Sequence, residues 1–210
     1  MISGKDFIEK YSRFYETYMD VICKPNHAKC FIDQIFHTFV PFIKNQVVLE
    51  MGPCSGYWTM ALLEAGAKHI IGIEKYKPFY DDALKMFDIY NVDSKLYTYH
   101  LDELPWCLDH IDYSEATICT MFGVIYHTYD HAGFAHRLWD SNIQTVLIES
   151  DMREHRGLFM ELSPYPEVLR LTPNKESLMS LFQRVGFQCY YPPFPSWNNY
   201  GQRGMMVAHK

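Results

Sequence analysis

Three acidic residues each end or follow a short apolar run in the first half of the chain. Glu50 closes "QVVLE", Glu74 closes "HIIGIE", and Asp102 follows "LYTYHL". Carboxylates accept hydrogen bonds from hydroxyl and amino groups and pair with cations. In an open parallel sheet, ligands bind outside the carboxyl ends of the strands. The spacing therefore predicts a ligand site lined by acids at that edge of a sheet.

A glycine-containing turn follows the first of these runs, in the stretch "EMGPCSGYW" from Glu50 to Trp58. Gly52 and Gly56 remove side chains where backbone would approach a ligand, and a helix expected from Tyr57 points its N-terminus there. The dinucleotide pattern G-x-G-x-x-G fails at Cys54, and no G-K-S/T follows for a phosphate loop. A turn opened by an acid suits a ligand with a cationic amino-acid end.

The elements that position these residues alternate between short β-branched runs and longer helical patterns. Strands are predicted at 47–50, 69–74, 96–100, 117–121 and 145–149. Helices are predicted between them, at 57–64, 78–90 and 131–141. Such alternation with short connections predicts an α/β fold with a doubly wound, mostly parallel sheet.

Both ends of the chain depart from this alternation. The pattern "SGKD" from Ser3 resembles a capping box, and apolar spacing predicts one helix over 7–22 and a second over 28–42. Near the other end, a helix over 175–185 precedes strands at 187–191 and 205–208. Because no helix separates these two late strands, they are expected to pair antiparallel.

Composition sets limits on the function. The chain has 210 residues with 48% hydrophobic and 21% charged, which favours a single folded domain, and no apolar run approaches the roughly 20 residues of a membrane span. The charged N-terminal stretch predicts no secretion signal, so a cytoplasmic location is expected. The six cysteines form no C-x-x-C pair and are expected to be reduced thiols. A net charge of −6 weakens any broad phosphate-binding face.

The run "VVLEMGPCSGYWTMALLEAGAKHIIGIEKY" resembles the first two motifs of class I S-adenosylmethionine-dependent methyltransferases. The order of elements over 46–209 is similar to that family's seven-stranded sheet with its C-terminal antiparallel hairpin. The resemblance implies a single methyltransferase domain over 1–210. Within it we expect a helical cap over 1–45 and a Rossmann-like core over 46–210 with an insertion at 151–173.

The resemblance also implies S-adenosyl-L-methionine as the cofactor. Glu50 and the glycine turn would hold its methionine part, Glu74 the ribose hydroxyls, and Asp102 the adenine amino group. Cys54 stands where the family usually has its middle glycine. The cofactor-binding set expected is Glu50, Gly52, Pro53, Cys54, Ser55, Gly56, Glu74, Lys75, Asp102, Glu103 and Phe122.

On the acceptor side, the segment "MFGVIYHTYDH" follows the fourth predicted strand. Methyl transfer is an in-line displacement, so most catalysis can come from aligning the nucleophile, and a base helps when the acceptor is a hydroxyl or protonated amine. Tyr126 and His127 are the catalytic candidates, with His127 as base. The alternative is that His127 only orders the loop.

Three classes of function stay open. The first is methyl transfer to a small-molecule O or N acceptor. The second is a methyl- or carboxymethyl-transferase acting on tRNA or other RNA, since the "YH" segment resembles the wobble-uridine tRNA carboxymethyltransferases and Arg153 and Arg156 could meet an anionic acceptor. The third is a protein that binds the cofactor or cleaves its sulfonium without methyl transfer. The acidic balance favours a small molecule over RNA.

Two further features bear on a metal and on a partner. His127, His131 and His136 have no third ligand at a recognisable spacing, so no metal is expected. The loop 192–200 places Phe194, Trp197 and Tyr200 among prolines. It could wall an acceptor pocket or form a contact in a homo-oligomer, and no membrane partner is expected.

Overall fold

The computed structural model describes residues 2–14, 32–33, 35–103, 106–152, 161–162, 171–193 and 203–210. These residues fall into two compact units, Met1–Asp102 and Glu103–Lys210, and each is described by itself. The division of 1–210 into a cap, a core and an insertion stays a prediction. Arg153, Arg156 and most of the loop 192–200 lie outside the described residues.

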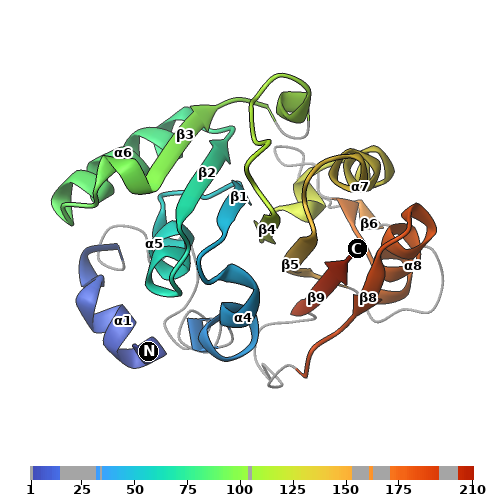
Figure 1. The fold of residues 1–210 in the computed structure, drawn as a ribbon, viewed down its shortest axis with the longest axis horizontal. Helices are drawn as coiled ribbons and strands as arrows, with labels where there is room; N and C mark the ends of the chain where they lie inside the picture. The colour runs from blue at the N-terminus through green and yellow to red at the C-terminus, as the bar shows by residue number, and fades with distance from the viewer. Residues whose placement is uncertain are drawn as a thin grey trace. The chain divides into compact units, whose positions relative to one another are not determined.

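The first unit carries three parallel strands in the order β3-β2-β1 (Figure 1). They are β1 (Val47–Met51), β2 (His69–Glu74) and β3 (Tyr97–Leu101), and the helices α5 (Tyr57–Glu64) and α6 (Lys77–Ile89) pack against them. Every residue of β1 is buried, as is every residue of β2 after His69. Because both faces of these strands are covered, they appear in the sequence as continuous apolar runs.

The N-terminal segment of this unit differs in part from its prediction. Helix α1 (Gly4–Lys10) is capped as expected, with the Ser3 side chain accepting from the Asp6 N–H. Residues 15–22 of the first predicted helix, and 28–31 and 34 of the second, lie outside the described residues. Of the rest of the second predicted helix, Ile32 and Asp33 are α-helical, whereas the π-helix η1 (Ile35–Phe39) and the short α4 (Val40–Ile43) take the place of one continuous α-helix. The proline in the first turn of α4 has no N–H to donate to the preceding turn, so one regular helix cannot continue through it.

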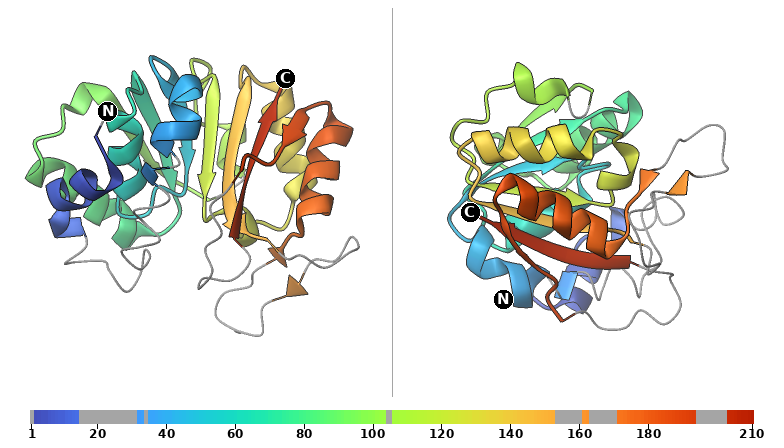
Figure 2. Two further views of the ribbon diagram at one scale, coloured as in Figure 1. Left: turned by 90° about the horizontal axis from the view of Figure 1, so that it is seen from below. Right: turned by 90° about the vertical axis from the view of Figure 1, so that its right-hand side faces the viewer.

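The second unit carries four strands in the order β4-β5-β9-β8. Its main elements are β4 (Ile118–Phe122), α7 (His131–Asp140), β5 (Thr145–Asp151), α8 (Lys175–Val185), β8 (Gln188–Tyr190) and β9 (Arg203–His209). β4 and β5 are parallel, whereas β9 is antiparallel to both β5 and β8. α7 and α8 lie side by side, in yellow and orange in Figure 2. The predicted C-terminal antiparallel hairpin is confirmed.

Shorter elements connect these. They are the 3-10 helices η2 (Ser94–Leu96), η3 (Trp106–Asp109) and η4 (Ile125–His127) and the strands β6 (Glu161–Leu162) and β7 (Leu171–Thr172). β6 and β7 form a separate antiparallel pair inside the predicted insertion. The sequence did not predict them, because strands of two residues are too short to show a periodicity.

The predicted fold class is confirmed: the main sheet has seven strands, mostly parallel, with helices between them. Observed strands and helices of the core begin and end within about two residues of the predicted ones, the ordinary uncertainty of element ends. Within the described residues, no helix combines the length and the apolar character needed to cross a membrane.

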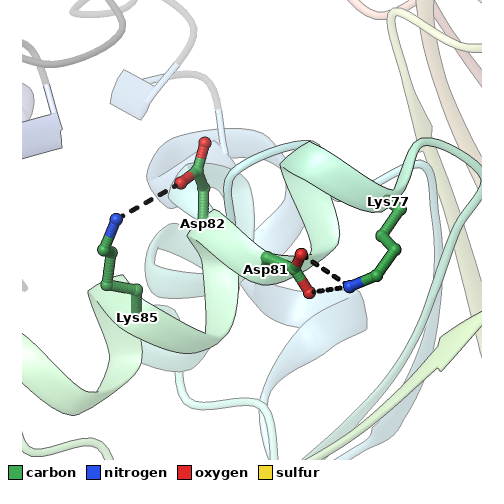
Figure 3. A network of polar contacts seen from close by, with 4 residues as sticks. All are labelled: Lys77, Asp81, Asp82 and Lys85. Atoms are coloured by element: carbon green, nitrogen blue, oxygen red, sulfur yellow. Dashed lines mark hydrogen bonds and ion pairs between the residues drawn. The ribbon is translucent and has the colours of Figure 1, made fainter.

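Helix α6 carries ion pairs on its exposed surface (Figure 3). Lys77 Nζ lies 2.6 Å from an Asp81 carboxylate oxygen, and Lys85 Nζ lies 3.8 Å from one of Asp82. Exposed pairs three or four residues apart stabilise a helix by only about 0.2–0.5 kcal/mol. These pairs therefore contribute little to the stability of α6.

Candidate cofactor site

The carboxyl ends of the three strands in the first unit meet at one edge of the sheet. This agrees with the prediction made from the acids that end or follow the apolar runs. The Gly52 N–H donates to the Ile73 carbonyl at 2.8 Å, and the Asp102 N–H donates to the Glu74 carbonyl at 2.9 Å. These bonds extend the sheet ladder past the strand ends. Gly52, Glu74 and Asp102 are thereby brought to neighbouring positions, so the structure assembles the edge that the sequence predicted.

The turn after β1 is built from left-handed residues. Gly52, Cys54 and Gly56 have φ angles of 63°, 55° and 83°. Cys54 thus takes the conformation that a glycine would supply, at a cost of roughly 1–2 kcal/mol for a residue with a Cβ. At Gly56 a Cβ would also lie 2.7 Å from the Phe87 ring, so only glycine fits there. The chain therefore forms a glycine-type turn although its middle glycine is replaced.

Glu74 ties this turn to the end of β2. Its Oε2 accepts from the Cys54 N–H and its Oε1 accepts from the Tyr76 N–H, both at 2.8 Å. The side chain is buried, and burial raises its pKa while the backbone donors oppose that shift. A backbone bond from Lys75 adds a third donor, so of the roughly four acceptor positions of a carboxylate one remains for a ligand hydroxyl. Glu74 is thus both a brace for the turn and a candidate partner for a diol.

Glu50 lies on β1 below the turn and is almost fully buried, at 2% exposure. Its Oε2 accepts from the Thr59 hydroxyl, while its Oε1 has no hydrogen-bond partner among the described residues. Burial raises the pKa of Glu50 to about 8; the Thr59 bond opposes this and the nearby Glu74 adds to it. A buried carboxylate oxygen without a donor is uncommon in proteins and calls for an explanation. A ligand that brings a donor is the simplest one.

A row of three residues crosses the strands at the level of Glu50. Glu50 is the register partner of Gly72, and Gly72 is the register partner of Tyr99. A Cβ on Gly72 would lie 2.2 Å from the Tyr99 ring, so the ring occupies the space of the missing side chain. The Tyr99 hydroxyl hydrogen-bonds the Thr59 hydroxyl. Thr59, Gly72 and Tyr99 were not among the residues predicted from the sequence. The one signal for them was a glycine inside the β-branched run "HIIGIE".

The other expected cofactor residues take varied positions. Pro53 and Ser55 are buried within the turn, Asp102 is partly exposed, Lys75 and Glu103 are exposed, and Phe122 is buried at the end of β4. The Ser55 hydroxyl oxygen has no partner among the described residues. Burial, with a contribution from Glu74, raises the pKa of the Cys54 thiol to about 12. Because only a thiolate is a strong nucleophile, Cys54 is a structural residue of the turn.

The catalytic candidates Tyr126 and His127 lie in the second unit, on η4, four and five residues after the end of β4. Tyr126 is buried and His127 is exposed, with ring centroids 4.4 Å apart. Arg203 hydrogen-bonds the Tyr126 hydroxyl and pairs in bidentate fashion with Glu149, with 2.6 Å between Nη2 and Oε2. Burial lowers the pKa of Arg203, but Glu149 raises it by more, so the guanidinium stays charged.

The histidines considered for a metal have other surroundings. His131 is 2% exposed, and its Nε2 lies 2.8 Å from the Ile125 carbonyl, to which it donates. Burial lowers the pKa of His131, so it is neutral near pH 7. His136 is exposed on α7. In the part of the chain that the structure describes, no three His, Cys, Asp or Glu side chains gather in a way that could hold a metal ion.

Comparison with known proteins identifies the fold. No model of a protein family matches the chain, and no curated protein does. The chain is similar to the structure of an S-adenosylmethionine dependent methyltransferase from Mesorhizobium loti, with a TM-score of 0.65 and 10% identity, over 85% of this chain and 97% of that one.

Two more structures are similar over almost their whole length. Magnesium protoporphyrin IX methyltransferase (ChlM) from Synechocystis PCC 6803 with bound SAH has a TM-score of 0.66 and 11% identity, over 97% of this chain and 94% of that one. A DhpI-SAH complex has a TM-score of 0.65 and 11% identity, over 99% of this chain and 94% of that one. The fold is therefore that of the class I S-adenosylmethionine-dependent methyltransferases.

Proposed function

We propose that this protein is an S-adenosylmethionine-dependent methyltransferase that acts on a small-molecule O or N acceptor. The observation that carries this proposal is the partnerless Oε1 of Glu50 beneath a glycine-type turn, at the carboxyl edge of a methyltransferase fold; among the described residues nothing donates to that oxygen. A fold alone does not define an activity, so the proposal depends on these residues.

The side chains at this edge fit the cofactor group by group. Glu50 offers a carboxylate oxygen to the ammonium of the amino-acid end, and Glu74 offers acceptors to the ribose hydroxyls. Asp102, beside Glu74, would meet the adenine amino group. When bound, S-adenosylmethionine supplies a methyl group on a positively charged sulfur. The contribution of the chain is then to align the acceptor and exclude water.

On the acceptor side, we keep His127 as the proposed base and Tyr126 as a residue that contacts the acceptor. The exposed imidazole on η4 would take the proton from a hydroxyl or ammonium acceptor. Once an acceptor is found, His127→Ala is expected to lower the transfer rate by about 10²-fold or more. His136→Ala, on the exposed face of α7, is the control and should leave the rate unchanged.

Calorimetry tests the cofactor assignment. We expect the wild-type protein to bind S-adenosylmethionine and S-adenosylhomocysteine, and Glu74→Gln to bind both about 10- to 100-fold more weakly, since an amide nitrogen would then face a backbone N–H donor. Asp88→Asn, an exposed acid on α6, controls for the loss of one charge. Unchanged affinity in Glu74→Gln would contradict the ribose assignment, and no binding to the wild-type protein would contradict the whole proposal.

A labelling experiment separates the three functional classes. The protein is incubated with cofactor labelled in the methyl group, together with either a pool of small metabolites or total tRNA, and the products are separated by chromatography. Label in the metabolite fraction supports the proposal, and label in the RNA fraction supports the RNA-modifying alternative. Breakdown of the cofactor without any acceptor would indicate sulfonium cleavage instead.

A further inference from the structure

We propose that Tyr99 and Thr59 are positioning residues that hold Glu50 ready for a cationic amino group, and so make the site selective for ligands that carry an amino-acid end. This inference rests on the proposed function, because it concerns the same cofactor site. It assigns roles to two hydroxyl groups on β3 and α5 that the sequence did not single out.

The row Glu50, Gly72 and Tyr99 explains how Tyr99 reaches the site. Neighbouring strands lie about 4.8 Å apart, so Tyr99 on β3 stands roughly 10 Å from Glu50 on β1. Residues in register share one face of the sheet, and Gly72 between them has no side chain. The Tyr99 ring fills that gap, since a Cβ added at Gly72 would overlap it. Its hydroxyl thereby meets Thr59.

The hydroxyls of Tyr99 and Thr59 form a chain of hydrogen bonds in which each donates toward Glu50. Thr59 has a single proton, which it donates to Oε2 of Glu50. The hydrogen bond between Tyr99 and Thr59 must then be donated by Tyr99. Burial and the nearby Glu50 raise the pKa of Tyr99 well above its ordinary value, so the phenol keeps the proton that it donates. Thr59 therefore donates to one carboxylate oxygen of Glu50, and Tyr99 holds the Thr59 hydroxyl in the orientation that this bond needs.

The other oxygen of Glu50 is left for a ligand. Among the described residues, the titratable groups that act on Glu50 or on Tyr99 beside it include Glu74 on β2 and Cys54 in the turn, and neither of these is a cation. A ligand ammonium would supply both the missing donor and the missing positive charge at Oε1, which has no donor among the described residues. It would also favour the ionised form of Glu50, whose pKa burial raises to about 8. Binding below pH 8 should therefore release a proton.

Two ligands with the same nucleoside test this selectivity. S-adenosylhomocysteine carries the amino-acid end, whereas 5′-methylthioadenosine lacks it. We expect Tyr99→Phe and Thr59→Val to weaken S-adenosylhomocysteine binding about tenfold, the effect of one hydrogen bond, and to change 5′-methylthioadenosine binding less than about twofold. Thr59→Ser, which keeps the hydroxyl, and Tyr97→Phe, two residues along β3, should bind both ligands like the wild-type protein.

The outcomes distinguish this inference from the proposed function. If the wild-type protein binds neither ligand, the proposed function fails. If it binds both, but Tyr99→Phe weakens the two equally or neither, Tyr99 is a packing residue and the inference fails.

A pH series on the wild-type protein gives a second readout that does not depend on how a variant folds. Affinity for S-adenosylhomocysteine should rise up to about tenfold per pH unit between pH 6 and 8, because each unit removes the proton from more of the Glu50 population. Affinity for 5′-methylthioadenosine should stay flat over the same range. Equal slopes for the two ligands would overturn the proton-coupled recognition by Glu50.

Discussion

At the scale of single residues, two buried acids at neighbouring strands have different surroundings. Glu74 accepts a backbone N–H at each carboxylate oxygen, whereas Glu50 accepts one hydroxyl and leaves its second oxygen without a partner among the described residues. Donors stabilise the charged form of an acid and burial penalises it. Burial is the largest influence on both acids, and it raises the pKa of Glu50 to about 8.

The raised pKa of Glu50 predicts how stability depends on pH. Its pKa is about 8 in the folded chain against an ordinary value of 4.5, so the folded state binds more protons between these values. The contribution of protonated Glu50 to the free energy of unfolding is fully present below about pH 4.5. It is lost as the pH rises through 8, by on the order of a few kcal/mol. Urea unfolding between pH 5 and 8 should show that the free energy of unfolding falls less with rising pH for Glu50→Gln than for the wild-type protein. Parallel curves would contradict a protonated Glu50.

Cys54 gives a second prediction at this scale. At φ 55° a β-branched side chain is strained, whereas glycine is not. We expect the free energy of unfolding of Cys54→Gly to lie within about 1 kcal/mol of the wild-type value. For Cys54→Val we expect it to be lower by about 2 kcal/mol or more. Cys119, buried in β4, is the matched control, because in a strand valine should be tolerated better than glycine. If the glycine variant were more stable than the valine variant at both positions, or less stable at both, the conformational explanation would be disproved.

At the scale of elements, the site depends on strands in register. Glu50, Gly72 and Tyr99 come from three strands and are joined by a helix residue, Thr59. Glycine in a strand weakens it, so its presence at the centre of β2 needs a packing reason. The Tyr99 ring supplies that reason.

Gly72→Ala tests this packing. The added methyl group would overlap the Tyr99 ring, and overpacking typically costs about 1–3 kcal/mol. Denaturant unfolding should show this loss, with weaker binding of S-adenosylhomocysteine because Tyr99 is displaced from Thr59. In the Tyr99→Ala background the same change should cost much less, since the ring is gone. Additive losses in the double variant would show that Gly72 and Tyr99 are independent.

At the scale of the whole molecule, charge limits the choice of acceptor. The chain has 19 basic and 25 acidic residues, a net charge of −6. Affinity for nucleic acid comes largely from basic side chains that neutralise phosphates. Action on tRNA, which the wobble-uridine resemblance implies, therefore stays a prediction with a specific test.

Filter binding of total tRNA provides that test. In roughly 150 mM salt we expect no binding tighter than the roughly 10⁻⁴–10⁻⁶ M of non-specific complexes. Small-molecule transfer, in contrast, should be insensitive to moderate salt. Submicromolar tRNA binding that weakens steeply with salt would contradict a small-molecule acceptor and favour the RNA-modifying alternative.

The sequence by itself determined the order of strands and helices and the three acids at the strand ends. These depend on local patterns: apolar runs mark the buried strands, and Glu50, Glu74 and Asp102 follow directly from where the runs end. The π-helix before Val40 and the two-residue strands β6 and β7 were not predictable, because each is too short to reveal its own period.

Only the tertiary structure decided what each acid does. Thr59 and Tyr99 lie 9 and 49 positions after Glu50 in the chain, and no local pattern links them to it. Their hydrogen bonds exist because the register of β1, β2 and β3 aligns Glu50 with Gly72 and Tyr99. Cys54 likewise takes a left-handed conformation in a turn whose N–H at that residue is held by Glu74, on another strand. Sequence specifies which groups are present, and packing between distant segments specifies which of their atoms remain for a ligand.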